Sequence, residues 1–418
     1  MLAEASAELD YQETEADSGL HVVMVSESAL SHACGVTTSV LQVARFMMDE
    51  GHKVTIVCPS PAEDSVGEAE VITTRSVNLK GFSVGLMSKR KFTGLFEELE
   101  PDVVHAASPM KTPKGVGLFL GGHAISAASE LGIPITAVYQ TDAVRFAGHL
   151  GLGLTAPVVE KLVRNMHNKA DLNLVPSSAA EEDLINWSVR PDSIVRWGRG
   201  VDVETFNPRR RESEEVEALR AQLAPSSETI IGITSRLEPE KSIHKLEILR
   251  GIPESRMVVV GKGTQRDKLA KRLGHQTTFT GRLGGEDLAN AYAAMDVFAY
   301  PSITDTFAQV VQEAKASGVP VVAAARGGPK DLVAHGETGY LYKPGGKRGM
   351  DHELHDYVKA LVEDPELRAY MSMAARESVE DRTWQHLGRE ILGHYRTSIE
   401  IQRGREAGAE RVGQLVAV

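Results

Sequence analysis

Short apolar runs alternate with longer amphipathic stretches along the chain from Leu20 onward. The segment 21–27 (HVVMVSE) predicts a strand, and the segment 36–52 carries apolar residues at helical spacing as far as Gly51. Further strand-like runs follow at helix-length intervals, at 53–59, 102–109, 134–142 and 171–177. Strands that are almost continuously apolar and separated by helices are typical of a parallel sheet covered on both faces. This part of the chain therefore predicts a doubly wound α/β fold.

The same pattern starts again after a connection at 198–208 that contains glycine and proline. It continues with strand-like runs at 229–237, 257–263, 277–283, 296–302 and 320–324. We therefore predict two α/β domains, at 20–199 and 200–383, with a ligand site in the cleft between them. The segment 384–402 has an apolar stripe at helical spacing, so residues 384–418 predict a C-terminal helix that crosses back to the first domain, followed by a tail.

The charge of the chain excludes some classes of partner. The formal net charge is −11, and residues 1–19 contribute six acidic side chains and no basic one, which predicts a disordered acidic leader. An acidic balance argues against a nucleic-acid partner. The two cysteines, Cys34 and Cys58, indicate a reducing compartment, and no apolar run is long enough to span a membrane. We expect a cytoplasmic protein.

Motifs for metals and common cofactors are missing from the sequence. No G-x-G-x-x-G follows the first strand, and no G-x-x-x-x-G-K-[ST] is present. The tetrapeptide HELH at 352–355 departs from H-E-x-x-H and is interpreted as a solvated helix face. We therefore expect neither a metal nor a cofactor.

Candidate ligand-binding groups lie where predicted strands end. Gly35 stands at the start of the first helix, where backbone N–H groups favour a phosphate, although it could also merely form the turn. Arg236 and Lys241 follow the strand 229–237, and two cations at that edge suit a diphosphate. The alternative is a surface ion-pair network with Glu238 and Glu240.

Two acids separated by seven residues follow the strand 296–302. The helix is expected to begin near Asp305, which could be its N-cap, and Glu313 lies at the edge of the apolar face. Eight helical residues span about 12 Å, so the two carboxylates could contact opposite ends of one extended ligand. A helix cap and an unrelated surface glutamate are the alternative interpretation.

The order of these motifs resembles that of the retaining GT-B glycosyltransferases of family four. The residues that carry the resemblance are Arg236, Lys241, GKG at 261–263, FTGRL at 279–283, DVFAYPS at 296–302, the acid pair, and GGPKDLV at 327–333. The likeness covers residues 20–396. The branch that it resembles most is the actinobacterial GDP-mannose-dependent α-mannosyltransferases of lipid acceptors, through AVYQTDAVRFAGHLGLGLTAP, WGRGVD and FAQVVQEAKASG.

The resemblance implies two Rossmann-like domains, an acceptor-side domain followed by a nucleotide-sugar domain, and a role for each matching residue. Arg236 and Lys241 would hold the donor diphosphate and stabilise it as it leaves. The other implied donor contacts are Gly35 and Gly261 at the phosphates, Gly281 and Arg282 at the nucleobase, Asp305 with the backbone of Phe307, Ala308 and Gln309 at the sugar, and Glu313 at the ribose.

Two positions depart from the family pattern. Asp305 replaces the usual glutamate, and Gln140 stands where many relatives have histidine. Gln140 cannot act as a base, but the retaining reaction is thought to use the departing phosphate oxygen to take the acceptor proton. Asp142, two residues further on, could contact the donor or the acceptor.

The resemblance implies transfer of mannose from GDP-mannose to a glycolipid acceptor at the cytoplasmic membrane face. A UDP-sugar donor, a nucleotide-sugar epimerase and a catalytically inactive sugar-nucleotide-binding homologue are the alternatives. The segment 78–92 mixes Lys and Arg with Phe, Leu and Met, which suits peripheral contact with anionic lipid. An ordinary amphipathic surface helix would have the same composition.

Overall fold

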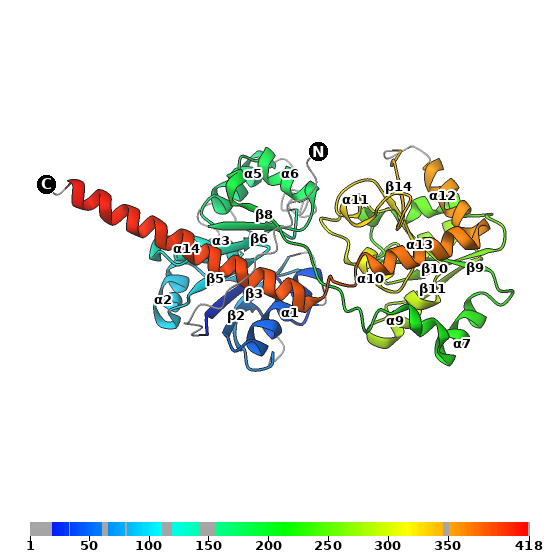
Figure 1. Cartoon of the computed structure of the whole chain (residues 1–418), viewed down its shortest axis with the longest axis horizontal. Coiled ribbons are helices and arrows are strands. Elements are labelled where there is room, and N and C mark those ends of the chain that lie inside the picture. Colours follow the sequence, from blue (N-terminus) through cyan, green and yellow to red (C-terminus); the bar gives the residue numbers. More distant parts are fainter. Residues whose placement is uncertain are drawn as a thin grey trace.

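The computed structural model describes residues 19–32, 34–60, 66–79, 82–110, 119–142, 156–345 and 351–416. The leader predicted at 1–19 lies outside the described residues except for Gly19. The described residues form two β-sheets, each covered by helices, and the two units stand side by side (Figure 1). We call them the first unit and the second unit.

The first unit is built on an eight-stranded sheet with the order β4-β3-β2-β1-β5-β6-β7-β8. All its pairs are parallel except β3 with β4. The strand order reverses between β1 and β5, so a crevice is expected at their carboxyl ends. The strands are β1 His21–Ser26, β2 Lys53–Pro59, β3 Glu70–Leu79, β4 Phe82–Leu86, β5 Val103–Ala107, β6 Ile135–Val138, β7 Leu172–Val175 and β8 Ile194–Arg196; the helices are α1 Gly35–Asp49, α2 Lys89–Leu99, α3 Gly121–Leu131, α5 Ala156–His167 and α6 Ser178–Asn186.

The second unit is built on a six-stranded parallel sheet with the order β11-β10-β9-β12-β13-β14. Its order reverses between β9 and β12. The strands are β9 Thr229–Thr234, β10 Ser255–Val260, β11 Thr277–Gly281, β12 Val297–Tyr300, β13 Val321–Ala324 and β14 Gly339–Tyr342; the α-helices are α7 Glu214–Leu223, α8 Arg266–Leu273, α9 Gly285–Ala294, α10 Gln309–Ala316, α11 Pro329–Leu332, α12 His352–Glu363 and α13 Pro365–Glu377. The predicted class, two doubly wound α/β units, is confirmed.

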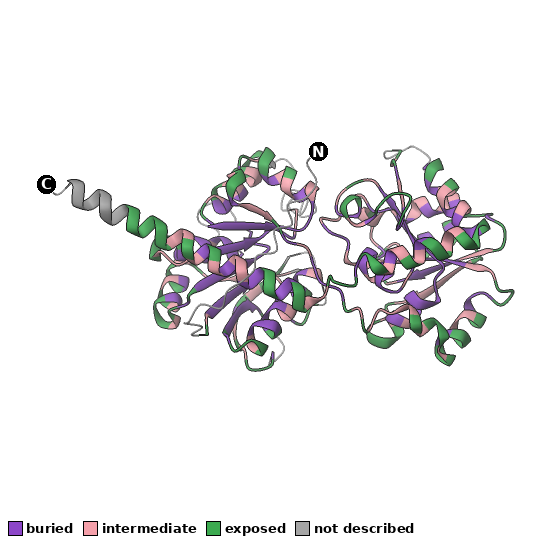
Figure 2. Cartoon of the chain, in the orientation of Figure 1, coloured by how far each residue is buried: buried purple, intermediate pink, exposed green. Residues whose placement is uncertain are grey.

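Burial follows the apolar runs that predicted the strands. The central strands of both sheets are buried, and the helices around them expose their outer faces (Figure 2). Every residue of β1, β12 and β13 is buried, as a parallel sheet covered on both faces requires.

The C-terminal helix α14 (Trp384–Val416) packs on the first unit although it follows the second unit in the sequence (Figure 1). It lies against α1, and Gly388 permits the contact, since a Cβ there would stand 2.3 Å from the ring of Phe46. The hydroxyl of Tyr395 is hydrogen-bonded to Nδ1 of His105 in β5 at 2.7 Å. These contacts tie the last helix to the first sheet.

Two chain segments therefore connect the units, and they are joined to each other. One follows β8 and the other leads from α13 into α14. The N–H of Val201 in the first donates to the carbonyl of Arg382 in the second at 2.8 Å. A Cβ at Gly200 would stand 2.7 Å from the backbone nitrogen of Trp384, so the two segments run in close contact.

A side-chain cluster also links the units at their surface. Asp331 of α11 accepts a hydrogen bond from the hydroxyl of Ser178 in α6 at 2.7 Å. The same carboxylate is paired with Arg196 at 3.0 Å, and Arg196 is paired in turn with Glu181 within the first unit at 3.1 Å. We call Ser178, Arg196 and Asp331 the surface link.

The segment 78–92 differs from the single amphipathic helix considered as an alternative, and that interpretation is wrong. The end of β3 pairs with β4 in an antiparallel hairpin, and α2 begins only at Lys89. Phe92 is fully buried, and Lys89 is paired with Glu130. Among the described basic side chains of this segment, Arg90 and Lys91 are exposed, and Lys80 lies outside the described residues. No helix among the described residues is long and apolar enough to cross a membrane.

Candidate functional site

Most of the predicted site residues lie in loops that follow the carboxyl ends of strands in both sheets. Gln140 follows β6 and Thr306 follows β12, and the hydroxyl of Thr306 donates to the carbonyl oxygen of Gln140 at 2.8 Å. The side-chain amide of Gln309 donates to the carbonyl oxygen of Gly200 at 2.9 Å. The carboxyl edges of the two sheets therefore contact each other at this position.

Asp305 is held by side chains of the second unit. Its carboxylate is paired with Lys241 and accepts hydrogen bonds from the hydroxyls of Tyr300 at 2.7 Å and Ser302 at 2.5 Å. Burial acts to raise the pKa of this carboxyl, but the Lys241 ammonium and the hydroxyl donors outweigh burial and hold the pKa below its ordinary value. Asp305 is therefore an ionised acid in a nearly buried pair.

The prediction that Asp305 caps the helix is wrong. Helix α10 begins at Gln309, and its N-cap residue is Ala308 with a left-handed φ of 74°. Asp305 lies in the loop before the helix, where Gly327 and Gly328 approach it. The N–H of Gly328 donates to the Asp305 carbonyl at 2.8 Å, and a Cβ at Gly327 would stand 2.5 Å from that oxygen. Glycine at positions 327 and 328 therefore lets the backbone approach this loop closely, because no Cβ would fit there.

Glu313 lies in the second turn of α10 and accepts a hydrogen bond from the hydroxyl of Tyr292 at 2.8 Å. Burial raises the pKa of this carboxyl to about 7, and the Tyr292 hydrogen bond lowers it only in part. A carboxylate with one oxygen bonded to a phenol retains acceptor capacity on the other, as a contact with vicinal hydroxyls requires.

The two predicted phosphate-binding cations have different surroundings. Lys241 is nearly buried and paired with Asp305, whereas the Arg236 side chain is 63% exposed and paired with Glu240 at 2.8 Å. Glu238 instead binds Thr264, accepting from its hydroxyl at 2.6 Å. The surface ion pair considered as the alternative is thus present for Arg236 and Glu240. The two cations therefore have different carboxylate partners.

The glycine turns after β10 and β11 contact each other. Gly261 has a φ of 141°, and a Cβ there would stand 1.8 Å from the carbonyl oxygen of Ser235. Its N–H donates to the carbonyl of Gly281 at 2.7 Å, and Arg282 beside it is exposed. Only glycine fits position 261. This turn therefore presents backbone groups without a side chain at the carboxyl edge of the sheet, where a ligand is expected.

The first unit contributes a buried polar pair that the sequence prediction missed. Gln140 is buried, and its Oε1 accepts a hydrogen bond from Nη2 of Arg199 at 3.0 Å. The Arg199 guanidinium also lies over the ring of Phe307, 5.8 Å from the centroid, and touches Gly35. Asp142 is half-buried at the end of a described range. The motif WGRGVD contained Arg199, which follows β8 and the buried Trp197, but no sequence pattern marked this arginine as buried.

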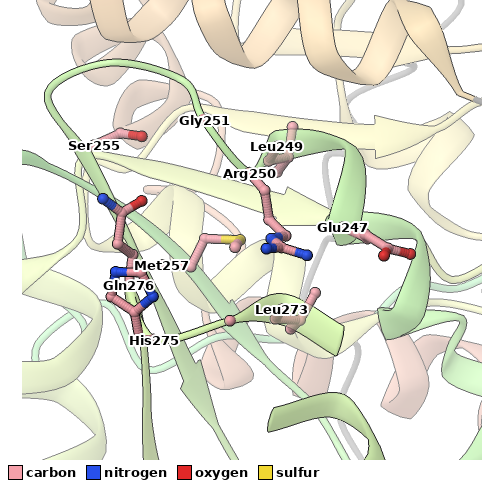
Figure 3. A pocket seen from close by; sticks show the side chains of 10 residues that line it. Glu247, Leu249, Arg250, Gly251, Ser255, Met257, Leu273, His275 and Gln276 are labelled. Carbon is pink, nitrogen blue, oxygen red and sulfur yellow. The ribbon is translucent and has the colours of Figure 1, made fainter. Parts of the chain in front are cut away.

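The candidate site contains no metal-binding cluster among the described residues, and it is separate from the open pocket of the second unit. Among the described residues no group of three or more His, Cys, Asp or Glu side chains could hold a metal ion. An open pocket lies at the amino ends of β10 and β11, on the edge of the sheet away from Asp305 (Figure 3). Arg250, Met257 and His275 are among its lining residues, and none of the predicted site residues is. It is therefore separate from the candidate site.

Two doubly wound sheets whose carboxyl edges meet at a set of charged side chains define the architecture of GT-B glycosyltransferases. The model of Glycosyltransferase Family 4 matches residues 33–205, and that of Glycosyl transferases group 1 matches residues 215–378. The chain belongs to this glycosyltransferase family, as its motifs predicted.

Relatives of known name agree with this assignment, and a solved structure shares the fold. The chain is 38% identical to a GDP-mannose-dependent alpha-mannosyltransferase of Mycolicibacterium smegmatis, over 90% of this chain and 97% of that protein. It is 33% identical to the protein of the same name from Corynebacterium glutamicum, over 92% and 90% of the two chains. The fold resembles sucrose-phosphate synthase of Thermosynechococcus elongatus with a TM-score of 0.73 and 19% identity, covering 90% of this chain and 98% of that one.

Proposed function

We propose that this glycosyltransferase moves mannose, with retention, from GDP-mannose to a glycolipid acceptor at the cytoplasmic membrane face. The observation that carries the choice of donor is the likeness to GDP-mannose-dependent alpha-mannosyltransferases over nine-tenths of the chain. The ion pair of Lys241 with Asp305 at the meeting edges of the sheets supplies the matching chemistry.

In this proposal the donor exchanges partners with the ion pair. The diphosphate takes the Lys241 ammonium, whose charge stabilises the leaving group as negative charge develops on it. The Asp305 carboxylate, still held by Tyr300 and Ser302, then accepts hydrogen bonds from the sugar hydroxyls. Arg236 is exposed enough to leave Glu240 for the diphosphate. The acceptor proton passes to the departing phosphate oxygen on the same face of the sugar.

The test measures binding and turnover separately. Calorimetric titrations with GDP, UDP and ADP establish the nucleobase, and a clear preference for UDP would contradict the mannose assignment. Incubation of GDP-mannose with a membrane lipid extract then identifies the reaction by mass spectrometry. A mannosylated lipid supports transfer, an isomerised donor supports epimerisation, and tight binding without turnover supports an inactive homologue.

A further inference from the structure

Arg199 is a buried cation that the proposed mechanism does not use. Its side chain is 7% exposed, and it lies where the chain leaves β8 for the second unit. Its Nη2 donates to Gln140, whereas its buried Nε has no acceptor among the described residues. Within that part of the chain no carboxylate forms an ion pair with it. The guanidinium is thus held by an amide and an aromatic ring, neither of which neutralises it.

A buried charge without a counter-ion is unfavourable for the folded protein. Burial lowers the pKa of Arg199 to about 10, while the fields of Cys34 and Asp305 act to raise it. The side chain therefore stays charged at neutral pH. Desolvation of a charge costs several kcal/mol unless an anion compensates for it, which indicates that an anion completes this arrangement.

The start of α1 adds positive potential at the same point. Gly35 is the first residue of this helix, and a Cβ there would stand 2.1 Å from Nη1 of Arg199. Cys34 is the N-cap, but its side chain accepts no capping hydrogen bond from a backbone N–H of the helix, and the first turn contains no acid. The N–H groups at a helix start carry a partial positive charge. A cation in contact with a helix start is electrostatically unfavourable unless an anion lies beside both of them.

The second unit closes this arrangement from the other side. Phe307 lies under the guanidinium, and Thr306 is hydrogen-bonded to Gln140. Both residues follow directly after Asp305, which forms an ion pair with Lys241. The buried cation and the helix start of the first unit therefore face the ion pair of the second unit, and an anion with two adjacent charged groups could contact both.

We propose that Arg199, beside the N-terminus of α1 where the resemblance already implied a phosphate contact at Gly35, binds the phosphoryl oxygens of a nucleoside diphosphate, and that Gln140 positions the guanidinium for this contact. The proposal rests on the proposed function only in taking a diphosphate as the ligand; it holds for any nucleobase. Gln140 suits the role because its amide accepts from the guanidinium without supplying a competing negative charge. A carboxylate at 140 would occupy Arg199 permanently.

The first experiment compares wild type with Arg199→Met in titrations with GDP, UDP and guanosine. The variant should bind the diphosphates about 10- to 150-fold more weakly, the range for a lost charge-assisted hydrogen bond, and bind guanosine as wild type does. Its melting temperature without nucleotide should not fall, because an uncompensated buried charge has been removed. A purely structural Arg199 would give the reverse result, a lower melting temperature and unchanged diphosphate affinity.

A second pair of variants tests Gln140 without removing the arginine. Gln140→Glu should weaken diphosphate binding as strongly as Arg199→Met, since the new carboxylate neutralises the guanidinium, while its ion pair preserves the fold. Gln140→Met, which removes the hydrogen bond and adds no charge, should have a smaller effect. Arg250→Met, at an exposed site on the far edge of the second sheet, is the matched control and should bind as wild type does.

Unchanged diphosphate affinity in both Arg199→Met and Gln140→Glu would overturn the proposal. This result in the variants can be told apart from failure of the proposed function, which is tested on the wild type alone. A wild type that prefers UDP contradicts the mannose assignment, and the comparison then proceeds with UDP. If it binds neither nucleotide, inorganic pyrophosphate is the probe, and a wild type that binds none of the three overturns both proposals.

Discussion

Asp305 and Lys241 show how residues assigned to different parts of one ligand can depend on each other. The resemblance placed Lys241 at the diphosphate and Asp305 at the sugar, but in the structure they are paired. Spacing along the chain could not reveal this contact, because it joins loops after β9 and β12, which are neighbours only in the folded sheet. The positions of the charges were predictable from strand ends, and their pairing was not.

Replacement of Asp305 by Asn should separate the two roles. GDP-mannose should bind about 10- to 150-fold more weakly, since a charged acceptor for the sugar hydroxyls is lost. Free GDP should bind at least as well as to wild type, because Lys241 no longer has a competing carboxylate. Parallel calorimetric titrations with both nucleotides measure the difference. An equal loss of affinity for GDP would show that Asp305 acts through Lys241 alone.

Glu313 should make nucleotide binding depend on pH near neutrality. Burial raises its pKa to about 7, and ribose hydroxyls donate to its ionised form, so GDP affinity should increase as pH rises from 6 to 8. In Glu313→Gln this increase should be absent. A variant whose affinity follows the wild-type pH profile would exclude Glu313 as its source.

The same shift predicts a change in stability with a definite sign. The unfolded chain keeps the ordinary pKa of 4.5, so the wild type loses stability as pH rises from 4.5 through about 7. Glu313→Gln cannot titrate and should lack this part of the loss. Urea unfolding of both proteins at several pH values tests it: the stability of the variant relative to wild type should increase up to pH 7 and then level off.

At the scale of elements, the buried central strands were predicted, whereas the edge strands β4, β8 and β14 were missed. The strands predicted at 21–27, 296–302 and 320–324 have mostly apolar sequences and were confirmed as the fully buried strands β1, β12 and β13. The strands β3 and β4 were missed because they form an antiparallel hairpin at the edge of the sheet, where polar residues interrupt the apolar pattern. The start of α10 was placed four residues early, since its N-cap is an alanine without a side-chain signal.

The contact of α14 with α1 is sensitive to the size of one residue. Gly388→Ala should lower the free energy of unfolding by about 1–3 kcal/mol, because the added methyl overlaps the Phe46 ring. Gly393→Ala in the same helix is the matched control, since no atom lies within 4 Å of its Cβ position. That change should raise stability by about 0.5–1 kcal/mol. Equal effects of the two variants would mean that the helices separate at this point without cost.

Helix α2 carries what remains of the proposed membrane surface. Arg90→Gln together with Lys91→Gln should reduce co-sedimentation with vesicles that contain anionic lipid, by roughly 1 kcal/mol of binding free energy per charge. Vesicles of neutral lipid are the control and should show no difference between the proteins. Anionic-vesicle binding that survives the double change would remove this helix from the proposal.

At the scale of the whole molecule, the contacts between the units were beyond sequence-based prediction. The repeated strand pattern predicted two α/β units, but the surface link joins residues from β8, α6 and α11 that no periodicity relates. Its residues are ordinary polar side chains, and only the placement of one unit on the other brings them together.

Loss of the surface link should loosen the arrangement of the units. Asp331→Ala removes the contacts of this carboxylate with Ser178 and Arg196 of the first unit, so the radius of gyration measured by small-angle scattering should increase. Glu181→Ala removes a partner of Arg196 that lies within the first unit, and it should leave the radius unchanged. If the two variants scatter alike, the link does not hold the units together.

The pair of hydrogen-bonded crossing segments has a mechanical consequence. A single flexible connection would let one unit rotate about three axes relative to the other. Two connections that are hydrogen-bonded to each other restrict this motion to a hinge rotation about one axis. The line through Val201 and Arg382 then defines one axis, about which the carboxyl edges can separate and meet again without twisting. The charged groups that face each other across the units would therefore return to the same register after every opening.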